Sequence, residues 1–187
     1  MKKILETPYY YWHEYLPKSL CEAIIEEGDK LRIDQAGIKD ENTIDKEARE
    51  TKVGFFPRQH WVESIVANVV QMSNAQAKWN FALDSAEAVQ YGIYNEGAYY
   101  KWHRDDDHLI SYNRKLSITV QLSDPTHYSG GDFKMCNFYN EELPYDPKLR
   151  GQGTIIVFPS LLRHTVEKVT RGTRKSLVQW YSGPAWQ

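Results

Sequence analysis

The run KLSITVQL at 115–122 constrains the fold more than any other stretch, because apolar and polar residues alternate along its whole length. Leu116, Ile118, Val120 and Leu122 would share one face of a half-buried β-strand. Other short β-type runs, separated by turn-forming segments, occur from about residue 80 onward. They are FALDS (81–85), AVQYGIY (88–94), GDFKMCNF (131–138), GTIIVF (153–158) and KSLVQWYS (175–182). Many short strands joined by turns predict an antiparallel jelly roll.

The part of the chain before residue 80 has helical rather than strand periodicity. Ser19 and Glu22 have the spacing of a capping box, and the apolar residues behind them predict a helix over 19–31. A second amphipathic helix is predicted from His60 to Gln76. Its apolar residues repeat at helical spacing as Trp61, Ile65, Val69 and Met72, with Val62, Val66 and Val70 beside them.

These patterns predict a mainly β protein with N-terminal helices and a double-stranded β-helix, or jelly roll, as its core. We expect Trp61 and Met72 to belong to the hydrophobic core. We also expect VGFFP (53–57) to form a short strand. The whole chain, 1–187, is predicted to be a single domain, with helical and extended support over 1–79 and the jelly roll over 80–183.

Composition excludes several classes of protein. The chain has 187 residues, 41% of them hydrophobic, so it can bury a real core. A formal net charge of −2 argues against a general nucleic-acid binder. No apolar run approaches about 20 residues, and the N-terminal stretch lacks the apolar segment of a secretory signal, so neither a membrane span nor secretion is expected. Two cysteines, Cys21 and Cys136, favour a reducing, cytoplasmic setting.

The stretch YNEGAYYKWHRDDD (94–107) contains the first candidate for chemistry. His103 and Asp105 are two residues apart, and on an extended strand such residues point to one face. An imidazole and a carboxylate would then supply two ligands of the 2-His-1-carboxylate triad that holds iron(II) and leaves positions open. Roughly one His-x-Asp/Glu match is expected by chance at this composition, so the pair needs support from elsewhere.

His164 is the best candidate for the third ligand. It follows the buried run TIIVFPSLLR and lies far enough after His103 for several strands to pass between them. The other histidines fit less well. His13 and His60 belong to the helical front part, His108 follows the acidic cluster, and His127 lies in a predicted turn.

Arg174 stands ten residues after His164, at the start of the run KSLVQWYS. A buried arginine at the mouth of a barrel needs an anion, and its guanidinium fork suits a carboxylate. An internal salt bridge with an aspartate or glutamate is the alternative. Alternation would turn the neighbouring Lys175 to the opposite face of the strand, and Arg171 is the other nearby cation.

Taken together, these segments resemble the prolyl 4-hydroxylase-like family of iron(II)- and 2-oxoglutarate-dependent dioxygenases. YNEGAYYKWHRD is similar to the family pattern Y-x-x-G-x-x-Y-x-x-H-x-D, with Tyr94, Gly97, Tyr100, His103 and Asp105 at the matching positions. KLSITVQLSDP followed by YSGGDF is similar to the L-S-x-x-x-x-L-S and G-G-[DE] segments, and RETKVGFF (49–56) is similar to the family's arginine-led segment. HTVEKVTRGTRKSLVQWYSG resembles the C-terminal signature, with His164, Val166, Val169, Gly172, Arg174 and Trp180 in place.

The resemblance implies roles for individual residues. His103, Asp105 and His164 would ligate Fe(II), and Arg174 would hold the distal carboxylate of 2-oxoglutarate. Tyr94 would reach the cosubstrate through its hydroxyl; a core tyrosine with a satisfied hydroxyl is the alternative. Trp180 would wall the pocket near the metal, with plain strand packing as its alternative. Fe(II), the cosubstrates 2-oxoglutarate and O2, and ascorbate as an additional candidate are the implied cofactors.

The chain departs from the family pattern in three places. Some members have a tyrosine that shares the distal carboxylate, whereas this chain has Gln121, with Thr119 one alternation away. Asp106 and Asp107 are unusually acidic; we expect them to be solvated, with attraction of a basic substrate as the alternative. The charged segment 39–52 occupies the place of the family's mobile substrate lid, and a solvated loop without a role is its alternative.

The leading prediction is hydroxylation of a prolyl residue in a protein or peptide, with succinate and CO2 as co-products. Hydroxylation of a free amino acid or other small molecule is the main alternative. Nucleic-acid demethylation is disfavoured by the net charge and by the lack of a second arginine in the run after Arg174. A non-catalytic jelly-roll binding module would not need the triad, and a zinc hydrolase would not need Arg174. No nucleic-acid or membrane partner is expected, and the sequence makes no prediction of oligomeric state.

Overall fold

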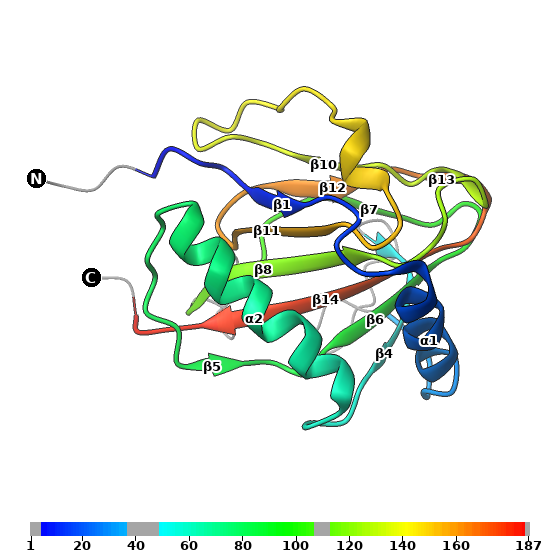
Figure 1. Cartoon of the computed structure of the whole chain (residues 1–187). Coiled ribbons are helices and arrows are strands. Elements are labelled where there is room, and N and C mark those ends of the chain that lie inside the picture. The colour runs from blue at the N-terminus through cyan, green and yellow to red at the C-terminus, as the bar shows by residue number, and fades with distance from the viewer. Residues whose placement is uncertain (1–4, 37–48, 107–112, 186–187) are drawn as a thin grey trace, which may run out of the picture.

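A computed structural model describes residues 5–36, 49–106 and 113–185 of the chain. Two antiparallel sheets make up most of the molecule (Figure 1). The larger sheet has the order β1-β11-β8-β14-β6-β4-β2, with β5 paired to β14 at the side. Its strands are β1 (Tyr10–Trp12), β11 (Ile155–Pro159), β8 (Arg114–Gln121), β14 (Arg174–Ser182), β6 (Gln90–Tyr94), β4 (Lys52–Phe55), β2 (Asp34–Gln35) and β5 (Ser85–Ala86).

The smaller sheet has the order β10-β12-β7-β3, and a two-stranded ribbon of β13 and β9 adjoins it. The strands are β10 (Phe133–Met135), β12 (His164–Val166), β7 (Tyr99–His103), β3 (Arg49–Glu50), β13 (Val169–Gly172) and β9 (Tyr128–Gly130). A short 3-10 helix, η1, spans Pro147–Arg150. This mainly β, two-sheet architecture confirms the predicted jelly roll, although β1 to β4 show that the first 79 residues also contribute strands.

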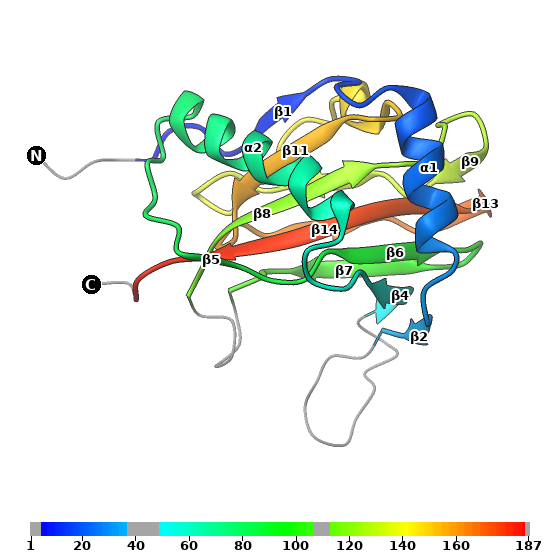
Figure 2. The same ribbon diagram turned by 60° about the horizontal axis from the view of Figure 1, so that its bottom comes forward.

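Two helices, α1 (Lys18–Gly28) and α2 (Trp61–Gln76), lie over one face of the larger sheet (Figure 2). The core beneath them includes the predicted face of β8, since Leu116, Ile118, Val120 and Leu122 are all at most 1% exposed. A second cluster of buried side chains lies between the sheets, and it includes Tyr94, Phe133, Ile156, Phe158 and Val166. The helices therefore seal one face of the larger sheet, and its other face turns toward the smaller sheet.

Helix α2 confirms the helix predicted from His60 to Gln76, but its buried stripe is rotated. His60 is the N-cap, and its side chain accepts a hydrogen bond from the backbone N–H of Val62. The buried positions include Val62, Val66, Val69, Val70 and Ser73. Trp61 is 41% and Met72 37% exposed, so their assignment to the core is wrong. The valines, with the small Ser73, let the helix lie close to the sheet, which leaves the two larger side chains at the margin.

Helix α1 begins one residue earlier and ends three residues sooner than predicted. The backbone carbonyl of Pro17 accepts hydrogen bonds from Leu20 and Cys21, so Pro17 is the N-cap and no side chain caps the helix. The expected capping box of Ser19 and Glu22 is therefore wrong. The run FALDS also does not form a strand as a whole, since only Ser85 joins β5. Among the described residues, no helix combines the length and hydrophobicity that crossing a bilayer requires.

Candidate active site

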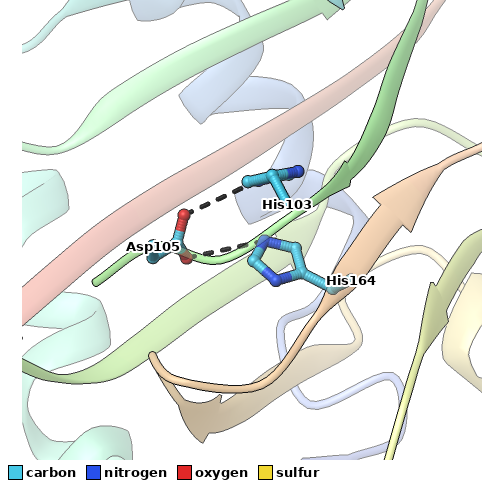
Figure 3. Close-up of side chains that lie close together, drawn as sticks. All are labelled: His103, Asp105 and His164. Atoms are coloured by element: carbon cyan, nitrogen blue, oxygen red, sulfur yellow. Dashed lines mark ion pairs between the residues drawn. The ribbon is translucent and has the colours of Figure 1, made fainter. Parts of the chain in front are cut away.

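His103, Asp105 and His164 lie together at one end of the smaller sheet. Their potential ligand atoms are all within 4.8 Å of one another. His103 and His164 are direct partners in the pairing of β7 with β12, so the sheet places the two imidazoles side by side. Nε2 of His103 is 3.6 Å from Oδ1 of Asp105, and Nε2 of His164 is 3.5 Å from Oδ2 (Figure 3). The three side chains converge on one point, two of them from paired strands and Asp105 from the turn after β7.

Asp105 does not reach this point in the way that the sequence suggested. Strand β7 ends at His103, and Asp105 lies in the turn that follows. Its position is fixed by the backbone instead: its N–H donates to the carbonyl of Ser160, and its own carbonyl accepts from Nη1 of Arg114. The prediction that His103 and Asp105 lie close together is therefore confirmed, but not because both residues lie on one strand.

Both imidazoles present Nε2 to the centre of the cluster. Nδ1 of His103 lies 2.8 Å from the carbonyl oxygen of Lys101, and Nδ1 of His164 lies 3.0 Å from that of Leu162. A carbonyl can only accept, so each Nδ1 carries the proton and each Nε2 keeps a free lone pair. This arrangement orients histidines as metal ligands.

The surroundings of the cluster favour the neutral form of His103 and the ionised form of Asp105. Burial disfavours the charged imidazolium of His103, and nearby His164 adds repulsion, so the pKa of His103 falls to about 3. For Asp105, burial acts to raise the pKa, but His164, His103 and the Ser117 hydroxyl outweigh it and the net pKa is lowered. These are the protonation states that a metal ion requires of its ligands.

Aromatic rings enclose the imidazoles. The ring of Tyr100 stacks on His103 with centroids 3.5 Å apart, and Phe158 meets His164 edge-on at 4.7 Å. Arg49 of β3 lies over the other side of the Tyr100 ring at 4.5 Å. The side chains that carry the donor atoms therefore have little freedom to rotate, which prepares them to bind without further ordering.

Arg174 is 2% exposed and has no ion pair with any described residue. Its Nη2 donates to Oε1 of Gln121 over 2.8 Å, and its guanidinium lies 5.0 Å from the centre of the Tyr94 ring. Gly131 makes room for it, because a Cβ at this position would stand 3.2 Å from Cδ of Arg174. The internal salt bridge considered from the sequence is absent in the described part of the chain.

Gln121 completes this polar recess. Its Oε1 is occupied by Arg174, while its Nε2 is buried and has no hydrogen-bond partner among the described residues. Gln121 and Ser176 are direct partners in the pairing of β8 with β14. Thr119 lies on the same side of β8 but makes no hydrogen bond to Arg174. Tyr94 is also buried beside this recess, with its ring facing the Arg174 guanidinium.

Trp180 lies opposite Ser117 in the pairing of β14 with β8, on the side of the metal ligands. The Arg114 guanidinium stacks over its indole at 4.1 Å and forms a two-pronged ion pair with Glu87. Plain strand packing is therefore an incomplete description of Trp180, because the half-buried guanidinium of Arg114 also lies against its ring.

The remaining predictions concern charged residues near the site and the expected lid. Lys175 turns away from the recess and binds Asp29, as alternation predicted, and Arg171 is exposed. Asp106 is not solvated, since Arg104 binds both of its oxygens and its side chain is 8% exposed. Asp107, His108 and the part of the expected lid over 39–48 lie outside the described residues.

Three residues that contact the cluster were not predicted from the sequence. Ser117 and Ser160 form hydrogen bonds around Asp105, and Arg114 links Asp105 to Trp180 and Glu87. Ser117 carried a usable signal, because it is a polar residue on the second face of an otherwise buried, alternating strand. Ser160 and Arg114 carried none, because their contacts arise only when distant strands pair.

The residues present fit an Fe(II) ion and a dicarboxylate. Two neutral imidazoles and one carboxylate, with no thiolate, form the donor set that suits non-haem Fe(II). The recess around Arg174 contains a buried cation with no counter-ion and a buried amide N–H with no acceptor among residues 5–36, 49–106 and 113–185. A carboxylate would supply both the counter-ion for the Arg174 guanidinium and the acceptor for the Gln121 N–H.

A two-sheet jelly roll with a 2-His-1-carboxylate cluster and a buried arginine defines the class of non-haem oxygenases. Residues 89–182, about half of the chain, match the sequence profile of the 2OG-Fe(II) oxygenase superfamily, and the chain belongs to this superfamily. The prediction made from the motifs is thereby confirmed. Membership implies Fe(II), 2-oxoglutarate and O2 as cofactor and cosubstrates.

Curated relatives are similar over this same part. A PKHD-type hydroxylase from Prochlorococcus marinus is 36% identical over 93 residues, and one from Xylella fastidiosa is 35% identical over 95. These matches cover 49% and 50% of this chain, respectively, and 40% of each relative, so the chain matches less than half the length of these proteins.

Solved structures share the fold over nearly the whole chain. A prolyl-4-hydroxylase from Pseudomonas putida aligns with a TM-score of 0.68 at 21% identity, covering 95% of this chain and 94% of its own. A prolyl hydroxylase from Trichoplax adhaerens, in complex with a peptide fragment of hypoxia inducible factor, aligns with a TM-score of 0.73 at 14% identity, covering 94% and 83%. These similarities confirm the jelly-roll fold.

Proposed function

We propose that this protein is an Fe(II)- and 2-oxoglutarate-dependent dioxygenase that hydroxylates a C–H bond of a prolyl residue in a protein or peptide. The observation that carries the reaction type is the buried Arg174, which has no counter-ion in the part of the chain that the structure describes and shares an interior with the His103–Asp105–His164 cluster. A zinc hydrolase or a binding module would have no use for this pairing of sites.

In this proposal His103 and His164 hold the ion through Nε2, and Asp105 holds it through one carboxylate oxygen. Arg174 binds the distal carboxylate of 2-oxoglutarate, and the free N–H of Gln121 donates to the same group. The Tyr94 hydroxyl is placed to reach the cosubstrate as well, whereas Thr119 only lines the recess. Bound Fe(II), 2-oxoglutarate and O2 would supply the oxidising chemistry, yielding succinate, CO2 and a hydroxylated substrate.

The rest of the interior orients the substrate and limits the access of water. Trp180, held by Arg114, would form the wall next to the metal, and Tyr100 covers His103. Neither the Trp180 ring nor the Tyr100 ring has to gain or lose a proton in this proposal. Both act by filling space around the metal site. The residues of the chain therefore position the reactants, and the oxidant is supplied by the bound groups.

Two observations support a peptide as the substrate. The structural relatives named above include prolyl hydroxylases, one of them bound to a peptide. The surface also has a hollow of about 540 Å³, and its lining includes chain neighbours of the candidate ligands but none of the ligands themselves. Arg104 and Asp106 flank Asp105, and Leu162 and Arg163 precede His164 in this lining. In this proposal an extended peptide lies along the hollow while one of its residues enters the metal site.

We also propose that residues 1–187 act as one domain in a reducing, cytoplasmic setting, where Cys21 and Cys136 stay as thiols.

The test is succinate formation by the Fe(II)-loaded protein under air, with and without a panel of proline-containing peptides. We expect peptide-stimulated succinate together with the gain of one oxygen atom on the peptide. His164→Ala should abolish both signals because it removes a ligand, while His127→Ala, a change at an exposed histidine, should retain them. Succinate without any peptide response would favour a free amino acid or another small molecule as the substrate. Full activity of His164→Ala would contradict the proposed site.

A further inference from the structure

The carboxylate of Asp105 has one oxygen already engaged by the protein. The Ser117 hydroxyl lies 2.6 Å from Oδ2 and donates to it. Ser117 is completely buried, and Asp105 is 8% exposed. Hydrogen bonds to a carboxylate of this length are among the strong ones, particularly where water has no access.

The direction of the next hydrogen bond follows from proton counting. Ser117 has a single hydroxyl proton, and the ionised carboxylate can only accept, so this proton points at Asp105. The Ser160 hydroxyl is 2.9 Å from the Ser117 oxygen, and it must therefore be the donor in that contact. The result is a directed chain in which Ser160 donates to Ser117 and Ser117 donates to Asp105.

Sheet pairing and backbone contacts hold this chain rigidly. Ser117 of β8 pairs with Phe158 of β11, and Ser160 directly follows that strand. Ser160 also accepts the backbone N–H of Asp105 through its carbonyl at 3.0 Å, and its own N–H donates to the Lys115 carbonyl at 3.0 Å. Asp105 is thus held by Ser160 at its backbone and by Ser117 at its side chain.

The chemistry of the proposed metal centre suggests a function for the hydrogen bond from Ser117 to Asp105. An octahedral ion with three protein donors has three open positions, and a chelating 2-oxo acid plus O2 needs all of them. If both oxygens of Asp105 bound the ion, only two positions would remain. We infer that Ser117, supported by Ser160, is a positioning residue that retains Oδ2 and so keeps Asp105 a one-oxygen ligand. This inference rests on the proposed function.

The test uses Mn(II) as a redox-stable probe, without any turnover. In Ser117→Ala, Oδ2 loses its donor in a buried site and is expected to turn toward the ion. Two readouts follow: the Mn(II) affinity by titration, and the number of Mn(II)-bound waters from the relaxation of water protons. Without the Ser117 hydroxyl, the carboxylate of the metal-free variant is no longer held in position, and we expect the cost of ordering it to outweigh the second oxygen contact. Mn(II) binding by Ser117→Ala should therefore weaken by about tenfold or more. We also expect the variant to hold one bound water fewer than the parent.

Control variants separate this role from general packing. Ser117→Thr keeps a hydroxyl and should restore parent hydration, whereas Ser160→Ala should weaken binding by a smaller factor because it removes only the supporting donor. Ser73→Ala removes another completely buried hydroxyl, which accepts from Trp12, and should leave Mn(II) binding unchanged. If Ser117→Ala does not fold, the contrast between Ser160→Ala and Ser117→Thr decides the question.

Parent affinity and parent hydration in Ser117→Ala would overturn the inference. So would equal losses in Ser160→Ala and Ser73→Ala. If the parent itself binds no Mn(II) and His164→Ala behaves identically, the proposed metal site fails, and that result differs from a failure of the serine pair alone.

Discussion

At the scale of single residues, the recess around Arg174 shows how a buried charge can be tolerated and used. The guanidinium has an amide oxygen and an aromatic face as neighbours, but no carboxylate among the described residues. A buried cation without a counter-ion is costly, and structures retain one where a ligand supplies the missing charge. In the proposed function, the pair of Arg174 and Gln121 would receive the distal carboxylate of 2-oxoglutarate.

Replacing Arg174 with alanine should weaken 2-oxoglutarate binding by about 2–5 kcal/mol, because truncation leaves the buried carboxylate unpaired. Arg174→Lys keeps the charge but loses the fork, so we expect an intermediate loss. The measurement is 2-oxoglutarate affinity by calorimetry on the Mn(II)-loaded protein. Arg171→Ala, at an exposed neighbouring arginine, is the matched control. Unchanged affinity in Arg174→Ala would reject its assignment to the cosubstrate.

At the scale of elements, strand β8 serves two environments at once. Its apolar face belongs to the core under α2, and its polar face carries Ser117, Thr119 and Gln121 toward the candidate site. Strand β14 complements it, with Arg174 and Trp180 facing the site while Leu177 joins the core. The period of two in a strand is what keeps stability and chemistry on separate faces of the same segment.

This separation predicts that a change in the core of β8 alters stability without altering the site. Ile118 is 1% exposed, and Ile118→Ala should lower the free energy of unfolding by about 2–5 kcal/mol through a buried cavity. Mn(II) affinity per folded molecule should stay at the parent value. Met72→Ala, on the exposed side of α2, should cost about 0.5 kcal/mol or less. Chemical denaturation with parallel metal titration checks both, and a large loss of metal affinity in Ile118→Ala would show that the two faces are coupled.

At the scale of the whole molecule, the cluster of ligands makes the metal-free protein sensitive to acid. The pKa of His103 lies at about 3 in the folded state, against about 6.5 in an unfolded chain. Between these values the unfolded chain binds a proton that the folded protein does not. Folding stability should therefore fall as the pH drops below about 6.5, by up to about 1.4 kcal/mol per unit from this group.

We expect the unfolding free energy of the metal-free protein to decrease between about pH 7 and pH 5, and the slope to be smaller in His103→Gln. The lowered pKa of Asp105 acts in the same direction, but only at more acidic pH, outside this window. Denaturant titrations at each pH provide the measurement. An identical slope in parent and His103→Gln would show that the histidine is not held neutral by the fold.

The sequence by itself determined the class of fold and the identity of the chemical groups. The alternation of β8 fixed which of its residues join the apolar core under the helices, since a strand has only two faces. It did not predict that the polar face is buried as well, because that face is covered only when the second sheet packs against it. The motif around His103, Asp105, His164 and Arg174 was readable because residue type and spacing are local properties of the chain. The same holds for Lys175, whose opposite orientation follows from its neighbour alone.

The tertiary structure decided everything that depends on pairing between distant segments. Asp105 lies beyond the end of its strand, and it reaches the cluster only because Ser160 and Arg114 hold its backbone. The rotated stripe of α2 was likewise set by contacts that no short window contains. Hydrogen-bond partners across a sheet follow from register, and register is fixed by the fold as a whole.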